Sequence, residues 1–286
     1  MKKTVVSPGS TTIINAISTG FGSAFGIDLN IKASVSENNK GKIISKSDIG
    51  ADTKLMDMCA DAVLDYYDVD CSLTIETETN LPMGSGLSSS SALSNAVCMA
   101  VSSYVAEEFN KEPLDDLGLL NLAIDTSFEA KVTITGAYDD ASASYFGGVV
   151  VCDNYNRKHI ISEKFPESDI LIFLVDKESL TIDVDVERLS LISSMVDLAF
   201  KQAKEKNYYN ALNLNGILYS SVLGYDSNIA LEALSAGAKA SGLSGTGSAF
   251  TAIVDDSSID DVKEAWNQFE GEVIETKVNN QGTILL

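Results

Sequence analysis

Residues 82–92 read Pro82-Met-Gly-Ser-Gly-Leu-Ser-Ser-Ser-Ser-Ala92. Before them, Cys71–Glu78 alternates in the manner of a half-buried strand. After them, apolar side chains recur every three or four residues from Leu93 to Val105, which is typical of an amphipathic helix. Two glycines let the backbone turn tightly with its N–H groups facing one centre, and the N-terminus of the helix adds free N–H donors and partial positive charge. The segment predicts a phosphate-binding loop; the alternative is a flexible Gly/Ser linker before a serine-capped helix.

Two common phosphate loops are excluded by inspection. The chain contains no G-x-x-x-x-G-K-[ST] segment. Gly84-x-Gly86 lacks the third glycine of the dinucleotide-binding fingerprint, because Ser89 stands in its place. The predicted loop is therefore neither a Walker A loop nor a Rossmann loop.

Three further segments carry small, polar or acidic residues. One is Ser7-Pro-Gly-Ser-Thr-Thr12, and another is Ser241-Gly-Leu-Ser-Gly-Thr-Gly-Ser248. The third, Thr135–Gly148, holds the adjacent carboxylates of Asp139 and Asp140. Adjacent aspartates repel each other when both are buried, so a fold tolerates them best in solvent or beside a cation or a reacting proton. A solvated turn is the alternative to a catalytic site.

Helix and strand patterns are mixed along the whole chain. The chain has 286 residues, of which 45% are apolar, enough for two adjoining domains. We expect the boundary after the strand that follows Gly147-Gly148, which gives domains 1–150 and 151–286. The expected helices span about 115–131, 186–206, 208–223, 227–237 and 259–269, and the expected strands about 147–152, 169–176, 249–254 and 273–278.

The charge balance excludes one class of partner. The chain carries 41 Asp and Glu against 20 Lys and Arg, a formal net charge of -21. Such a surface repels polyanions, so nucleic acid is not an expected partner. A small anion can still bind where backbone amides and a metal ion supply positive charge locally.

The scarce residue types narrow the compartment and the chemistry. Four cysteines without a C-x-x-C pair, and no secretory signal, indicate reduced thiols in a cytoplasmic protein. No run approaches 18 apolar residues, so we expect no membrane segment. His159 is the only histidine, which excludes two-histidine metal sites and leaves Ser-His-Asp or Cys-His catalysis dependent on this one side chain. We expect His159 at the surface, and acid–base chemistry to depend on carboxylates.

The motifs, in their order along the chain, resemble those of the GHMP kinases. The family's second motif has the form P-x-G-x-G-L-x-S-S-A, which Pro82–Ala92 matches with one extra serine. Ser10–Asp28 and Thr135–Gly148 resemble, more narrowly, the archaeal-type shikimate kinases of this superfamily. The resemblance implies an α+β fold of two domains, the first with a left-handed β-α-β crossover and the second ferredoxin-like. It also implies ATP, Mg²⁺ and a small-molecule substrate, shikimate, phosphorylated on its 3-hydroxyl.

The resemblance also implies roles for particular residues. The family's catalytic aspartate falls on Asp140 rather than on Asp139, and the Mg²⁺ ligands fall on Ser90 and Glu129. The N-terminal motif would contact substrate through Ser10, Thr11, Thr12 and Asn15. The ATP phosphates would lie on Pro82, Met83, Gly84, Ser85, Gly86, Leu87, Ser88, Ser89, Ser90, Ser91 and Ala92.

Arg188 is our candidate for the substrate carboxylate. The chain has two arginines, and Arg157 lies in a polar stretch that predicts a hairpin turn, whereas Arg188 opens a long helix. A guanidinium can hold a carboxylate through two parallel hydrogen bonds. The alternatives are a surface ion pair of Arg188 with Asp185 or Glu187, and a substrate carboxylate held by a lysine or by the backbone amides of a turn expected at Gly9–Thr12.

Two departures from the family pattern leave other functions open. Ser10 stands where a lysine or arginine often follows Pro-Gly, and the third motif, Ser244–Phe250, keeps only its first part. Mevalonate and galactose are therefore less expected as substrates. Homoserine kinase, another GHMP kinase or a mevalonate-type decarboxylase, and a non-catalytic ligand sensor, are the alternatives. Retention of Asp140 and Glu129 argues against the sensor.

Overall fold

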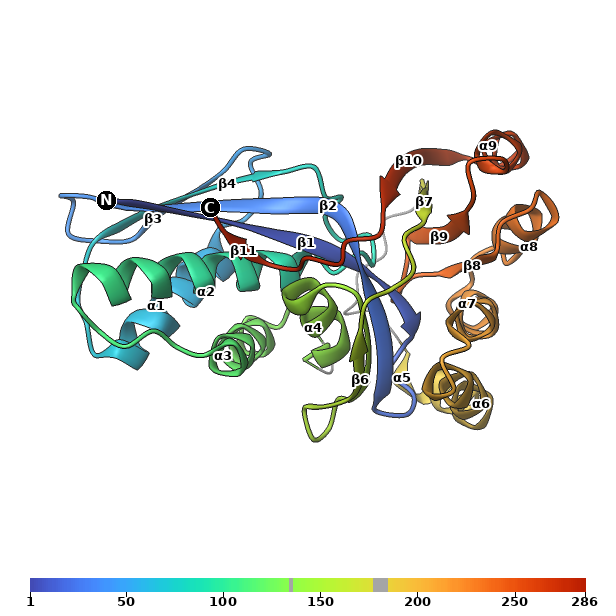
Figure 1. Ribbon diagram of the computed structural model, residues 1–286, viewed down its shortest axis with the longest axis horizontal. Helices are drawn as coiled ribbons and strands as arrows, with labels where there is room; N and C mark the ends of the chain where they lie inside the picture. The colour runs from blue at the N-terminus through green and yellow to red at the C-terminus, as the bar shows by residue number, and fades with distance from the viewer. Residues whose placement is uncertain (134–135, 177–184) are drawn as a thin grey trace.

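A computed structural model describes residues 1–133, 136–176 and 185–286. Within these residues, a mixed sheet has the strand order β11-β1-β2-β4-β3, and β5 pairs with both β2 and β6. The larger domain is built on this sheet (Figure 1). Its strands are β1 (Lys2–Ile14), β2 (Phe21–Glu37), β3 (Ile44–Ser47), β4 (Leu73–Thr79), β5 (Val149–Asp153), β6 (Lys158–Glu163) and β11 (Ile284–Leu285).

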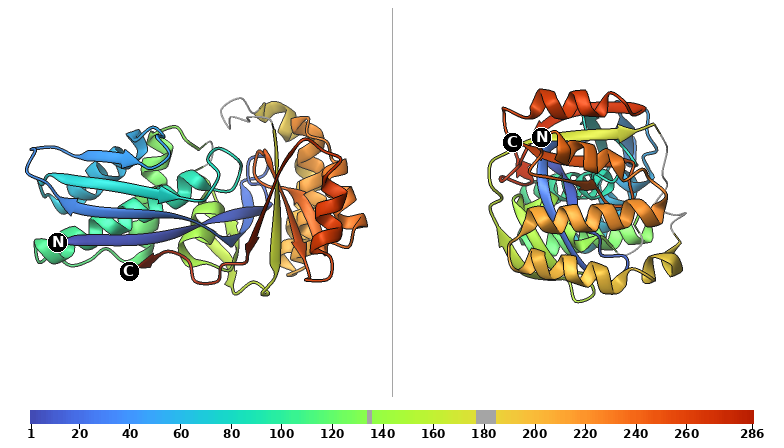
Figure 2. Two further views of the ribbon diagram at one scale, coloured as in Figure 1. Left: turned by 90° about the horizontal axis from the view of Figure 1, so that it is seen from above. Right: turned by 90° about the vertical axis from the view of Figure 1, so that its right-hand side faces the viewer.

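Four helices of the described chain pack on one side of this sheet, as Figures 1 and 2 show. The apolar stripe predicted after the serines forms α2, which packs against β1, β2, α1 and α3. Because α2 lies between a sheet and two helices, it is buried on most sides. The four helices are α1 (Lys54–Tyr67), α2 (Ser89–Glu108), α3 (Asp116–Glu129) and α4 (Tyr138–Phe146).

The smaller sheet is antiparallel, with the strand order β10-β7-β9-β8. In chain order its elements run strand, helices, strand, strand, helix, strand, which is the ferredoxin-like pattern and confirms that expectation. Its helices form the right-hand side of the molecule in Figure 1. The elements are β7 (Asp169–Val175), α5 (Val186–Ser190), α6 (Ser193–Lys204), α7 (Tyr208–Leu223), α8 (Asn228–Ser235), β8 (Ala240–Leu243), β9 (Ala249–Val254), α9 (Ile259–Trp266) and β10 (Gly271–Lys277).

The two sheets divide the chain between β6 and β7. Residue 150, the expected boundary, lies within β5, and β6 pairs with β5 in the larger sheet. The chain returns to the larger sheet at its end, where β11 pairs with β1. In the larger sheet β3 and β4 pair in parallel and are joined through α1, which forms the β-α-β unit of this domain.

Three segments differ from their sequence-based expectation. The helix expected at 186–206 is divided into α5 and α6. The Gly9–Thr12 stretch is not a turn but part of strand β1, with a register shift between Pro8 and Gly9. Asp139 and Asp140 lie in the first turn of α4 and Asp139 is only 2% exposed, so the solvated-turn alternative is wrong.

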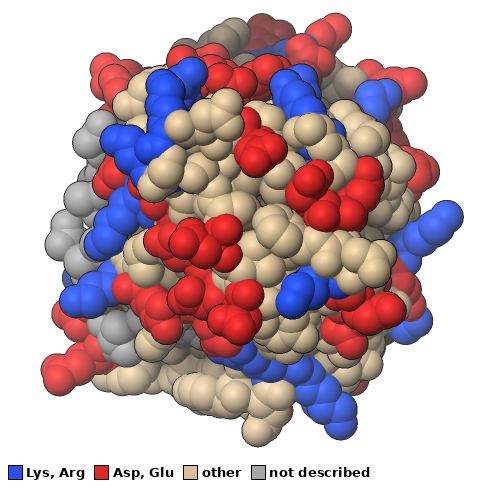
Figure 3. All heavy atoms as spheres, turned by 90° about the vertical axis from the view of Figure 1, so that its left-hand side faces the viewer, with Lys and Arg blue, Asp and Glu red and all other residues tan. Residues whose placement is uncertain are grey.

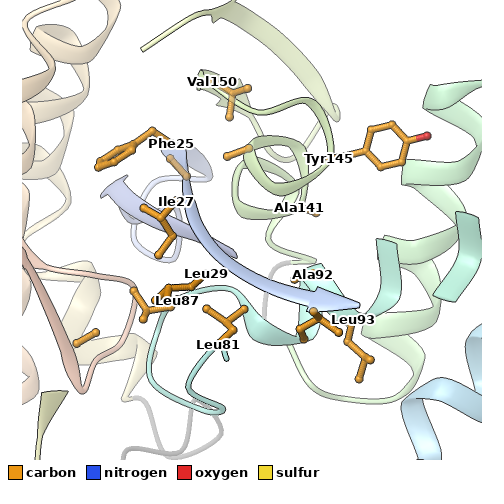
Figure 4. Packing of buried hydrophobic residues seen from close by; sticks show 14 of the residues in the cluster. Phe25, Ile27, Leu29, Leu81, Leu87, Ala92, Leu93, Ala141, Tyr145 and Val150 are labelled. Atoms are coloured by element: carbon orange, nitrogen blue, oxygen red, sulfur yellow. The ribbon is translucent and has the colours of Figure 1, made fainter. Parts of the chain in front are cut away.

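The core continues from the larger sheet into the loop before α2. Figure 4 shows Leu29 of β2 beside Leu81 and Leu87, the two leucines that flank the glycines. All three side chains are buried. Burying a leucine stabilises a fold by about 1.5–3 kcal/mol, so these contacts fix both ends of a loop whose centre stays free of the core.

The surface carries the expected excess of acid. Figure 3 shows Asp and Glu spread over one face, with Lys and Arg among them. The four cysteines are unpaired. Within the described ranges, no helix has the length and apolar character needed to cross a membrane.

Candidate active site

The predicted phosphate loop lies between β4 and α2. Gly84 and Gly86 have φ angles of +67° and +84°, a region that side chains rarely adopt. A Cβ atom built on Gly84 would meet nothing within 4 Å, so this glycine faces open space. Ser88, at φ +60°, precedes the first turn of α2, whose free N–H groups begin here.

The third glycine cluster packs directly on this loop. A Cβ atom on Gly86 would lie 2.4 Å from the Ser244 carbonyl oxygen. The Ser244 hydroxyl donates to the Gly86 carbonyl at 2.7 Å, and the Ala249 amide donates to the Ser85 carbonyl at 2.8 Å. Gly86 is therefore required by the approach of another part of the backbone, whereas Gly84 faces the pocket.

The N-terminal cluster completes the junction. The Thr12 amide and the Thr11 hydroxyl both donate to the Ser244 hydroxyl oxygen at 3.0 Å. The Ser10 hydroxyl donates to Ser88 Oγ at 2.7 Å. The three glycine-containing clusters, dispersed along the chain, thus meet around Ser244 and Ser88.

Asp140 points toward this junction from α4. Its Oδ1 accepts a hydrogen bond from Thr12 Oγ1 at 3.1 Å. Burial, and then the neighbouring charge of Asp139, raise the pKa of Asp140 well above its usual range, while hydrogen bonds from Thr12 and Ser88 oppose the shift. A carboxylate with a raised pKa is a stronger base, which suits proton transfer near neutral pH.

A pocket opens in front of Asp140. Its lining comes from the phosphate loop, α2, α3, α4, the end of β1 and the third cluster. None of its described lining residues is a lysine or arginine, so the backbone N–H groups of the loop and of α2 are the positive groups it presents to an anion. The lining is Thr12, Asn15, Ala16, Ile17, Gly84, Gly86, Ser88, Ser89, Ser90, Ser91, Ser94, Asn95, Ala123, Ile124, Ser127, Val132, Thr133, Gly136, Ala137, Asp139, Asp140, Ala141, Gly245 and Thr246.

Most of the predicted site residues converge here. Of the loop, Gly84, Gly86 and Ser88–Ser91 line the pocket, while Leu87 and Ala92 are buried in the core. Pro82, Met83 and Ser85 belong to the turn that supports the loop, where the Ser85 hydroxyl donates to the Pro82 carbonyl.

The predicted substrate residues divide in two groups. Thr12 and Asn15 line the pocket. Ser10 and Thr11 are fully buried behind it and hold the motifs together. Arg188 is exposed on α5 and is not among the pocket-lining residues. Its helix is followed by Ser193, whose hydroxyl donates to the Ser18 carbonyl beyond the Asn15–Ile17 rim.

The two predicted metal ligands occupy different positions. Ser90 lines the pocket in the first turn of α2. Glu129 is exposed at the end of α3, two residues beyond the pocket-lining Ser127. No group of three or more His, Cys, Asp or Glu side chains in the described ranges could hold a metal ion. The oxygen-rich lining suits a hard cation that keeps several waters, such as Mg²⁺.

Sequence reasoning missed a polar wall of the pocket. Ser94 Oγ and Ser127 Oγ lie 2.6 Å apart and join α2 to α3, and Asn95 Nδ2 donates to the Ala141 carbonyl at 3.0 Å. Ser94 follows Ser90 by one helical turn, so the i, i+4 spacing was a signal for it. Thr135, the start of the acidic cluster, lies outside the described residues.

Two family models match the chain. The one described as GHMP kinases N terminal domain matches residues 53–148, and the one described as GHMP kinases C terminal matches residues 199–272.

Similar proteins span essentially the whole chain. A protein of Methanobrevibacter smithii named shikimate kinase is 56% identical over 285 residues, covering 99% of this chain and 98% of its own length. A shikimate kinase of Methanothermobacter thermautotrophicus is 49% identical over 287 residues, 100% of this chain and 99% of its own. A crystal structure of mevalonate kinase aligns with TM-score 0.77 over 97% of this chain and 99% of that one at 17% identity, a likeness of fold.

Proposed function

Because the chain belongs to the GHMP kinase family, we propose that it transfers the γ-phosphoryl group of ATP to the 3-hydroxyl of shikimate. The observation that supports the reaction is the Asp140 carboxylate, which shares a pocket with the phosphate loop and is hydrogen-bonded to Thr12. The choice of shikimate rests on the similarity to proteins named shikimate kinase, one of them 56% identical over 99% of this chain.

In the proposed reaction, Asp140 accepts the proton of the 3-hydroxyl as the hydroxyl oxygen attacks the γ-phosphorus. The bond between the γ-phosphorus and the bridging oxygen breaks, and ADP leaves. The amides of Gly84–Ser91 and the N-terminus of α2 hold the phosphates, and fixed donors of this kind stabilise the charge that develops in the transition state. The chain thereby contributes alignment, a base and a polar cradle.

We propose Mg²⁺ as the metal, with Ser90 and Glu129 as its protein ligands. When bound, the ion would neutralise phosphate charge. This matters because the described pocket lining contains no lysine or arginine that could do so. Ser90 supports the assignment by its place in the pocket wall, and Glu129 by closing the helix that carries Ser127 to the same pocket.

For the substrate, we propose that Thr12 and Asn15 face the shikimate ring. Asn15 Nδ2 donates to the Gly245 carbonyl, which fixes the amide at the rim of the pocket. Ser10 and Thr11 support this wall from behind. Arg188 stays our proposal for the carboxylate, since α5 leads into the segment that is hydrogen-bonded to Ser18.

The test is an ADP-release assay with ATP and shikimate, homoserine, mevalonate or galactose as acceptor, with and without Mg²⁺. Of the four acceptors, we expect only shikimate to give Mg²⁺-dependent turnover. NMR should show the phosphate at the 3-position of the product. Turnover with another acceptor and not with shikimate would overturn the assignment of shikimate as the substrate. Binding of shikimate and ATP without any ADP release would indicate a ligand sensor.

A further inference from the structure

The reaction leaves one buried carboxylate of the pocket without a role. Asp139 is 2% exposed, and its Oδ1 accepts a hydrogen bond from Asn154 Nδ2 at 2.7 Å. It precedes Asp140 in the first turn of α4, so the two carboxylates leave the helix in different directions. Burying a charged group is costly unless it is compensated, and a polar but uncharged residue would fill the same space.

Two features of the surroundings are shaped for this carboxylate. A Cβ atom on Gly22 would lie 2.1 Å from Asp139 Oδ2, so only a glycine in β2 leaves room for it. Asn154 points its donor at Asp139 while its own Oδ1 is buried without a hydrogen-bond partner. Leaving the Oδ1 acceptor of Asn154 without a partner costs stability. The same orientation of the amide lets its N–H group donate to the Asp139 carboxylate.

Three ionisable groups near the pair, Cys152, Tyr219 and His159, are mainly neutral near pH 7, whereas Asp153 next to Asn154 is ionised. Burial raises the pKa of the Cys152 thiol on β5 and raises the pKa of Tyr219 on α7 to about 12. His159 of β6 contacts α4 at Ser142, and burial lowers its pKa. Neither carboxylate takes part in an ion pair with the described lysines and arginines.

The two carboxylates therefore act mainly on each other. The hydrogen bond from Asn154 and backbone hydrogen bonds at Asp139 and Asp140 favour the ionised form of Asp139, against the burial that raises its pKa. The pKa of Asp140 is raised as well, and the charge of Asp139 is the second cause of that shift after burial. A charge on Asp139 therefore delays the loss of the proton from Asp140.

We propose that Asp139 is a positioning residue that sets the basicity of Asp140: the buried carboxylate, held by Asn154 in the space left by Gly22, keeps Asp140 a stronger base than its own surroundings would. The inference rests on the proposed role of Asp140 as the base. It gives a function to a buried charge that the fold alone does not need.

The test compares Asp139→Asn with the parent enzyme. The variant keeps the shape and can accept from Asn154 but lacks the charge. We expect the acid limb of the kcat/KM profile for shikimate to move to lower pH by about one unit, the size of coupling at which two sites titrate as a pair. A residue that only held α4 in place would change the rate without moving the limb.

A second measurement does not need turnover. Carbon-13 NMR of the ligand-free protein follows the carboxyl carbon of Asp140, assigned by its absence in Asp140→Asn. We expect the titration midpoint of Asp140 to move to lower pH in Asp139→Asn. It should move less in Asn154→Ala, which removes a hydrogen bond that stabilises the ionised form of Asp139. Asn154→Ala also serves if Asp139→Asn does not fold.

The matched control is Asp153→Asn, which removes one negative charge from the residue next to Asn154. The Asp153 carboxylate binds Asn156 at the surface end of β5, and the variant should leave the midpoint of Asp140 unchanged. An unmoved Asp140 midpoint in Asp139→Asn would overturn the proposal. Full turnover in Asp140→Asn would instead overturn the proposed role of Asp140 as the base. The carboxyl titration would still show whether Asp139 changes the pKa of Asp140.

Discussion

Asp140, the proposed base, would serve the reaction at the expense of the fold. Its pKa is raised because burial and Asp139 both disfavour the charged form. Between the usual value, near 3.8, and the raised value, the folded state binds more protons than the unfolded state, so stability falls as pH rises through this window. Each unit of upward shift costs about 1.4 kcal/mol once the group is ionised in both states.

Asp140→Asn should therefore have opposite effects on rate and stability. We expect turnover to fall by about 10² to 10⁴, the usual contribution of a general base, while ATP still binds. The melting temperature should rise relative to the parent at pH 7–8, and the difference should vanish only well below pH 3.8, where the aspartate is protonated in both states. Steady-state kinetics and thermal melts at several pH values measure both effects.

Two outcomes would contradict this account of Asp140. Turnover within twofold of the parent would remove it from the catalytic role. A melting temperature below that of the parent at neutral pH would show that the carboxylate stabilises the fold, contrary to its burial beside Asp139.

At the scale of the element, the loop between β4 and α2 has two glycines in different surroundings. Gly84 faces open pocket space, whereas Gly86 lies against the Ser244 carbonyl. Both have positive φ, so their sequence spacing alone does not distinguish them. The proposed phosphate-binding role of Gly84 and the packing role of Gly86 can therefore be separated by substitution.

Gly84→Asn should affect ATP and Gly86→Ala should affect the fold. Asparagine tolerates the left-handed region, and its side chain would enter the space proposed for phosphate, so the KM for ATP should rise several-fold with little change in melting temperature. In Gly86→Ala the new methyl group would overlap backbone atoms, at a cost of about 1–3 kcal/mol. ATP-dependent kinetics and thermal melts of each variant give the comparison.

Gly50→Asn is the control for the left-handed backbone. Gly50 has φ +69° and no atom within 4 Å of a built Cβ, and it does not line the pocket. The Gly50→Asn substitution should change neither the KM for ATP nor the melting temperature. An unaltered KM for ATP in Gly84→Asn would remove the loop's centre from the phosphate site.

At the scale of the whole molecule, the C-terminal segment ties the two domains together. After β10 the chain bonds to β2 through the Asn279 amide and the Gly26 carbonyl at 2.8 Å. Thr283 then contacts α4: its amide donates to the Tyr145 carbonyl at 2.9 Å, and its hydroxyl donates to the Ser144 carbonyl at 3.2 Å. The helix that carries Asp140 is thus held at its C-terminal end by the last residues of the chain.

Thr283→Val should weaken this attachment while it keeps the size of the side chain. The hydroxyl also bonds to Ser7 Oγ at 2.8 Å, so valine would remove two buried hydrogen bonds, at about 1–3 kcal/mol in total. We expect a lower free energy of unfolding in urea. Thr276→Val is the control, because the Thr276 hydroxyl is buried without a hydrogen-bond partner, and its loss should be neutral or stabilising. Equal losses in both variants would contradict a role for Thr283 in the attachment.

The sequence alone predicted what depends on local chemistry. Alternation over Cys71–Glu78 and the stripe after Leu93 predicted β4 and α2, because the periods of strands and helices are written in neighbouring residues. The glycines between them predicted a loop with N–H groups facing one centre, since only glycine enters that backbone region freely. The order of the motifs was enough for the family, which the family models confirm.

Only the tertiary structure decided which residues meet. No local pattern shows that Ser244 bonds to Gly86, that Thr12 bonds to Asp140, or that Ser10 lies behind the pocket, because these partners are separated by more than 70 residues. The short helix α4 escaped prediction because its small residues carry little apolar periodicity. The burial of Asp139 depends on the space left by Gly22 and the donor of Asn154. A carboxylate's environment is fixed by neighbours in space, so the direction of its pKa shift could be given only after the chain was folded.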